Sequence, residues 1–133
     1  MQVEHLFVGV ISCFDARATN QARAWARERF APEGAVIDLI TSLAPERVLA
    51  GAPSAEQEGL RAQIIHAAET HGITDWVLAA HAGCEAGEAA MAETLARLAA
   101  AASALRGWGV PARRVAAIYM DGAGMVEEMP IYG

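Results

Sequence analysis

The stretch VISCFDAR at residues 10–17 joins an apolar run to side chains that can bind a metal or carry out acid–base chemistry. A second stretch, LAAHAGC at residues 78–84, has the same construction. These two places hold the only two cysteines of the chain, Cys13 and Cys84. Short apolar runs that stop at polar residues are typical of buried β-strands, so both stretches predict a strand whose carboxyl end carries the chemistry.

The rest of the chain alternates strand and helix patterns around these two stretches. We expect strands over residues 6–12, 35–41, 75–80 and 114–120, with a short last strand near 125–129. We expect helices over residues 19–30, 54–71 and 85–106, the first capped by Thr19 or Asn20, and a looser stretch over 42–53. This alternation predicts an α/β fold: a mainly parallel four-stranded sheet in the order 2-1-3-4, with helices on both faces and a short C-terminal hairpin strand.

Size and charge limit the kinds of function that remain. A chain of 133 residues suits one domain over residues 1–133. The net charge of −6 argues against nucleic acid or an anionic membrane as a partner. The apolar run at residues 6–11 is too short to span a bilayer and lacks the basic flank of a secretory signal. Cysteines placed beside a histidine more often bind metal or catalyse in a reduced compartment, so we expect a cytoplasmic protein.

The expected topology brings distant polar residues together. In the order 2-1-3-4 the first and third strands are neighbours, and ligands bind beyond the carboxyl ends of the strands at this point. Cys13 ends the first strand, and His81 and Cys84 follow the third. Two thiolates and one imidazole suit zinc, and three protein ligands leave the open fourth position of a catalytic site. Asp15 and Arg17 lie beside this predicted zinc site as a possible ion pair.

At these positions the chain resembles a known family. Residues 13–17, CFDAR, resemble the C-x-D-x-R motif of β-class carbonic anhydrases, and residues 81–84, HAGC, resemble their H-x-x-C motif. The resemblance covers most of the chain and implies a short, divergent member with one zinc per chain, bound by Cys13, His81 and Cys84. It implies a zinc lyase that hydrates CO2 to bicarbonate through attack by a zinc-bound hydroxide.

The resemblance also implies roles for Asp15 and Arg17 as the catalytic pair beside the metal. We expect Asp15 to orient the zinc-bound hydroxide and Arg17 to keep Asp15 ionised and aimed. Alternatively, Asp15 moves onto the zinc as a fourth ligand and closes the site until Arg17 recaptures it. The family further implies a homodimer or higher homo-oligomer with the active site near a subunit boundary.

Two departures from the family pattern keep other functions open. The family usually shows Arg-Asn-Ala-Gly after its second strand, where residues 41–45 read TSLAP, and Glu85 and Ala86 replace the glycines that commonly follow the second cysteine. One alternative is a zinc hydrolase of another small linear electrophile, of the carbonyl sulfide or carbon disulfide type. Others are a non-catalytic zinc-binding homologue and a metal-free cysteine hydrolase with His81 as base.

Four further polar residues are expected to lie outside the site. His66 and His71 are five positions apart, so they occupy different faces of one helix and are expected at its surface. His5 precedes the first strand and is given no role. Asp121, followed by Gly122, is expected to form the turn before the last strand.

Overall fold

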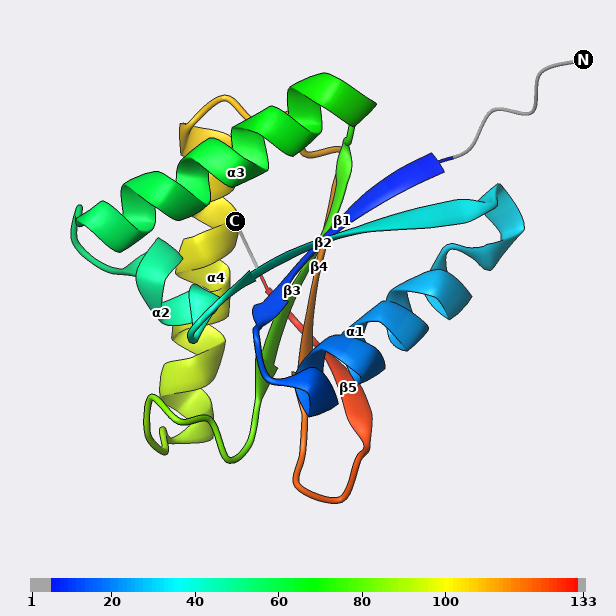
Figure 1. The fold of residues 1–133 in the computed structure, drawn as a ribbon. Coiled ribbons are helices and arrows are strands. Elements are labelled where there is room, and N and C mark those ends of the chain that lie inside the picture. Colours follow the sequence, from blue (N-terminus) through cyan, green and yellow to red (C-terminus); the bar gives the residue numbers. More distant parts are fainter. Residues whose placement is uncertain (1–5, 132–133) are drawn as a thin grey trace, which may run out of the picture.

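The computed structural model describes residues 6–131, which form a five-stranded sheet in the order β2-β1-β3-β4-β5 (Figure 1). The strands are β1 (Leu6–Cys13), β2 (Ala35–Ser42), β3 (Asp75–His81), β4 (Arg114–Met120) and β5 (Val126–Met129). The helices are α1 (Ala16–Arg29), α2 (Pro45–Ala50), α3 (Ala55–His71) and α4 (Met91–Gly107), with a short 3-10 helix at Ala31–Glu33. Strands β1 to β4 run parallel and β5 pairs antiparallel with β4, which confirms the α/β class, the strand order and the C-terminal hairpin strand.

The helices cover the two faces of the sheet unequally. Helix α1 lies on one face, and α2, α3 and α4 lie on the other (Figure 1). Strand β3 serves both cores, because Trp76, Leu78 and Ala80 pack on the α2–α4 side while Val77 and Ala79 pack on the α1 side. A parallel strand covered on both faces needs no polar positions, which explains its continuous apolar run. Within residues 6–131, no helix is both long and apolar enough to cross a membrane.

Helix α1 begins earlier than predicted. The expected start near Thr19 or Asn20 is wrong, because Asp15 caps the helix and its first residue is Ala16. The side chain of Asp15 accepts a hydrogen bond from the backbone N–H of Arg17 at 2.9 Å, which satisfies a free donor of the first turn. Only two residues therefore separate the helix from the strand that ends at Cys13.

Helix α4 begins later than predicted, and α2 was not predicted at all. The first residue of α4 is Met91, not Glu85, because Gly87 has a φ of 108° that no α-helix can contain. In the looser stretch over residues 42–53, α2 begins with Pro45 at the position where proline favours a helix start. A helix of six residues is too short to show a hydrophobic period in the sequence.

A close contact between Gly9 and Trp76 fixes the centre of the sheet. The two residues face each other across β1 and β3, and a Cβ atom added to Gly9 would lie 2.4 Å from two indole carbons. The indole cannot move aside freely, because its Nε1 donates a hydrogen bond to the Pro111 carbonyl at 2.8 Å. Only glycine therefore lets the indole lie over β1.

Asp75 fixes the amino end of β3, opposite the end that carries His81. Its side chain is fully buried and accepts hydrogen bonds from Arg114 Nε at 2.6 Å and Arg113 Nη2 at 2.9 Å. Burial alone would raise the pKa of Asp75, but the hydrogen bonds from Arg114 and Arg113 outweigh it and hold the pKa below its ordinary value. The ionised carboxylate therefore stabilises the fold.

We predict that Gly9→Ala lowers the free energy of unfolding by about 1–3 kcal/mol, because the added methyl overpacks a rigid contact. Gly59→Ala is the control, since a Cβ at Gly59 meets nothing within 4 Å and alanine favours the helix by about 0.5–1 kcal/mol. Urea denaturation monitored by circular dichroism measures both. An unchanged stability in Gly9→Ala would contradict the prediction.

We predict that Asp75→Asn lowers the free energy of unfolding by about 1–3 kcal/mol at pH 7, because the negative charge that accepts the two arginine hydrogen bonds is removed. A pKa depressed in the folded state gives stability that is present above the unfolded value of about 3.9 and is lost as the pH falls below it. The difference between wild type and variant should therefore shrink in urea denaturations at progressively lower pH. Glu69→Gln, an exposed change on α3, should show no such convergence.

Candidate metal centre

The structure brings Cys13, His81 and Cys84 together at the carboxyl edge of the sheet. Cys13 is the last residue of β1 and His81 the last of β3, and Cys84 follows three residues later. Because Ile11 lies opposite Leu78 in the parallel register, the two strand ends meet. The two sulfur atoms and a ring nitrogen of His81 all lie within 4.8 Å of one another. This cluster could hold one metal ion.

The imidazole of His81 is oriented as a metal ligand would be. Its Nδ1 lies 2.8 Å from the backbone carbonyl of Ala82. A carbonyl only accepts, so Nδ1 carries the proton and Nε2 presents a lone pair. Nε2 is buried and has no hydrogen-bond partner among residues 6–131. Buried polar atoms are rarely left unpaired, and a metal ion would supply the missing partner.

The two thiols also fit a divalent cation. Burial raises the pKa of Cys84, a hydrogen bond from the Ala86 N–H opposes this, and the neighbouring thiol of Cys13 raises the pKa further. Cys13 itself is only 2 % exposed. Two adjacent thiolates repel each other, and a divalent ion bound between them removes that repulsion. Two sulfurs and one imidazole nitrogen form a donor set typical of zinc.

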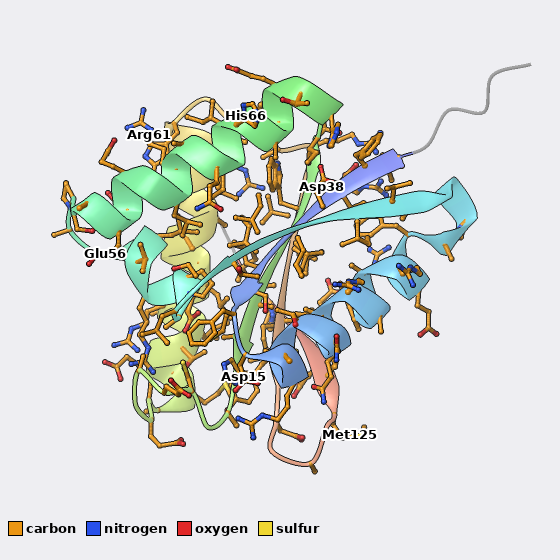
Figure 2. All side chains as sticks on the ribbon, viewed as in Figure 1. Asp15, Asp38, Glu56, Arg61, His66 and Met125 are labelled. Atoms are coloured by element: carbon orange, nitrogen blue, oxygen red, sulfur yellow. The ribbon has the colours of Figure 1, made fainter. Side chains whose placement is uncertain are left out.

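Asp15 and Arg17 form an ion pair at the edge of this cluster. The carboxylate accepts hydrogen bonds from Arg17 Nε at 3.1 Å and Nη2 at 2.7 Å, besides the backbone bond of the helix cap. The Arg17 guanidinium holds the pKa of Asp15 well below its usual range. The side chain of Asp15 is 17 % exposed and that of Arg17 is 78 % exposed. Asp15 therefore stands ionised where β1 gives way to α1 (Figure 2).

A cleft lies beside His81 on the α1 side of the sheet. It has a volume of about 130 Å³, and Arg17, Gln21, His81 and Asp121 are among its lining residues. Asp121 Oδ1 accepts hydrogen bonds from the backbone N–H groups of Ala123 and Met125, so its predicted role in the turn is confirmed. The cleft has room for a molecule of a few atoms.

A second, smaller cavity lies on the α2–α4 side of the cluster. Its volume is about 10 Å³, and its lining includes Glu46, Arg47, His81, Cys84, Thr94 and Tyr119. The side chain of Glu46 is 8 % exposed, and burial raises its pKa. These residues were not predicted as part of the site, because α2 itself was not predicted. The available signal was the proline of Pro45 followed by an acidic residue, a pattern typical of a helix start.

His66 and His71 lie away from the cluster. His66 is exposed on the outward side of α3, as predicted (Figure 2). The ring of His71 stacks on Phe7 with centroids 4.3 Å apart, and its Nδ1 contacts Asp38 Oδ2, so His71 is a partnered residue at the amino end of β1. His5 lies outside the described residues.

Comparison with known proteins agrees with the resemblance to carbonic anhydrases seen in the sequence. The family described as "Putative carbonic anhydrase" matches residues 3–130, a span that includes both cysteine motifs. A search of curated proteins finds no match. Because the family match extends over nearly the whole chain, the chain belongs to this family of carbonic anhydrase-like proteins.

Proposed function

We propose that the chain is a zinc-dependent lyase that hydrates CO2 to bicarbonate. The observation that carries this proposal is the clustering of Cys13, His81 and Cys84, whose two sulfurs and one ring nitrogen lie within 4.8 Å of one another, together with the buried, unpaired Nε2 of His81. Membership of the carbonic anhydrase-like family supports the same reaction class.

One zinc per chain would be held by the two sulfurs and the imidazole. Bound zinc supplies Lewis-acid chemistry that makes water a nucleophile near neutral pH. The hydrogen bond from His81 Nδ1 to the Ala82 carbonyl fixes the tautomer that frees Nε2 for the metal. Cys13 is fixed by the buried end of β1, so two of the three donors are delivered by the sheet.

Asp15 would act as the hydrogen-bond acceptor that orients the attacking water. Arg17 keeps the carboxylate ionised and aimed through three hydrogen bonds, one from its backbone and two from its guanidinium. For Asp15 to close the site as a fourth ligand, it would have to leave the guanidinium, so we assign the open arrangement to the described structure. The cleft of about 130 Å³ next to His81 gives CO2 a place to approach.

The other candidate functions differ in how well the site supports them. A metal-free cysteine hydrolase needs a thiol of lowered pKa, and burial raises the pKa of Cys84. Hydrolysis of carbonyl sulfide or carbon disulfide needs the same metal and a cleft of the same size. A non-catalytic zinc protein would keep the three ligands without needing Asp15.

We also propose a homodimer or higher homo-oligomer in the cytoplasm. The assembly is supported by exposed apolar side chains at the carboxyl edge of the sheet, among them Phe14 at 54 % and Leu43 at 44 % exposure. A reduced compartment is supported by two free thiols that lie close enough to share one metal ion.

We predict about one zinc per chain in protein purified without added metal, and its loss in Cys84→Ser, because a hydroxyl is a poor zinc ligand. Elemental analysis of the folded proteins measures the metal content. Ser103→Ala, an exposed change in α4, should keep the wild-type content. Folded wild-type protein without metal would contradict the zinc site and favour the thiol enzyme.

We predict that Asp15→Asn keeps its zinc but lowers kcat/KM for CO2 hydration by about 10²–10⁴-fold, the usual contribution of a positioned acid–base group. Asparagine is as good a helix cap as aspartate, so α1 should keep its start. Stopped-flow CO2 hydration measures the turnover. Full activity in the variant would remove Asp15 from the mechanism. A zinc-loaded wild type without CO2 turnover would instead favour another small electrophile or a non-catalytic protein.

A further inference from the structure

The guanidinium of Arg47 reaches from α2 to the segment that follows Cys84. Its Nη1 donates a hydrogen bond to the Ala86 carbonyl at 3.0 Å, and its Nη2 donates one to the Gly87 carbonyl. The Arg47 side chain is 25 % exposed, and both carbonyls that it contacts belong to exposed residues of the loop. Two donors of one planar guanidinium fix the direction of two successive carbonyls.

The same segment is bonded to Cys84 itself. The Ala86 N–H bonds to the sulfur of Cys84, and the Gly87 N–H donates to the Cys84 carbonyl at 3.0 Å. Ala86 and Gly87 therefore each bond to Arg47 through the carbonyl and to Cys84 through the amide. A shift of these two residues would move the sulfur relative to Cys13 and His81.

Other forces hold this segment weakly. Residues 84–90 lie between β3 and α4 and belong to neither. Ala86 and Gly87 are exposed, so no buried apolar contact fixes them. Gly87 has a φ of 108°, a conformation that glycine adopts freely, and it has no side chain that could hold it there through contacts. Short exposed loops of this kind open easily unless something holds them.

Helix α2, in contrast, presents Arg47 from a fixed position. Ala44 starts the helix in the left-handed region at φ 44° and ψ 63°, a strained conformation for alanine that persists only where the surroundings enforce it. At the other end, the side-chain amide of Gln57 donates to the carbonyls of Val48 and Gly51, both at 3.0 Å. The helix that carries Arg47 is thus held at both of its ends.

We propose that Arg47 is a positioning residue that holds the loop after Cys84 so that this thiol is prearranged for metal. The inference rests on the proposed zinc function, and it adds a residue that neither cysteine motif contains. Outer contacts of this kind commonly change metal affinity by 10–100-fold. The rival interpretation is that Arg47 only stabilises the fold.

Two variants of Arg47 separate these interpretations. Arg47→Met keeps the apolar stem and removes both hydrogen bonds, and Arg47→Lys keeps the charge but cannot make the paired contact. Arg61→Met is the matched control, because Arg61 belongs to α3, stacks over Trp108 and lies away from the cluster (Figure 2). The zinc dissociation constant is measured by competition with a chelator, beside amide hydrogen exchange of residues 82–90 in the metal-free proteins.

We expect Arg47→Met to weaken zinc binding by 10–100-fold and Arg47→Lys to weaken it less, with Arg61→Met within about twofold of wild type. Exchange should quicken at residues 82–90 in Arg47→Met and stay unchanged in β1 and β3.

Wild-type affinity in Arg47→Met would overturn the positioning role and leave the zinc site standing. Equal losses in Arg47→Met and Arg61→Met, or faster exchange throughout the sheet, would also overturn it in favour of fold stability. If Arg47→Met does not fold, wild-type affinity and exchange in Arg47→Lys would overturn it. A wild type without zinc affinity would sink the zinc function and this inference with it.

Discussion

The parallel pairing of β1 with β3 is the contact on which the candidate metal centre depends. With Ile11 opposite Leu78, the two strands leave the sheet side by side, although the residues at their ends are far apart in the sequence. The chain passes from β1 to the edge strand β2 and returns across the other face to β3, which makes this the point where the winding reverses. Both strands are buried on both faces, so Cys13 and His81 are placed by the most rigid part of the molecule.

This dependence explains how much of the fold could be predicted. A strand covered on both faces appears in the sequence as an apolar run with a sharp end, and β4 was predicted over its full range of Arg114–Met120 for this reason. The alternating helices predicted a parallel sheet, and the predicted strand order was the common order for such folds. Helix starts were less predictable, because Asp15 was interpreted only as part of a catalytic pair. In the structure the same carboxylate also caps α1, so one residue serves the helix and the site.

The contact between α2 and the loop after Cys84 could not be predicted. Arg47 bonds to backbone carbonyls, and every residue carries such a carbonyl, so Ala86 and Gly87 need no side chain complementary to arginine. The helix that delivers Arg47 is also too short for a visible period. The three clustered residues therefore differ in what surrounds them: the sheet places Cys13 and His81, whereas the loop that follows Cys84 is contacted by Arg47 from a helix distant in the sequence.

The charges around the cluster are arranged so that the carboxylates add little to it. Arg17 pairs with Asp15, and burial raises the pKa of Glu46, which favours its neutral form. Two thiolates would by themselves balance one divalent cation. A centre close to neutrality attracts an anion less than a centre of net positive charge would. Under the proposed function, such a centre would still admit neutral CO2 and would release anionic bicarbonate more easily. A metal bound at this site would have to compete with Arg17 for the Asp15 carboxylate, which the guanidinium already holds.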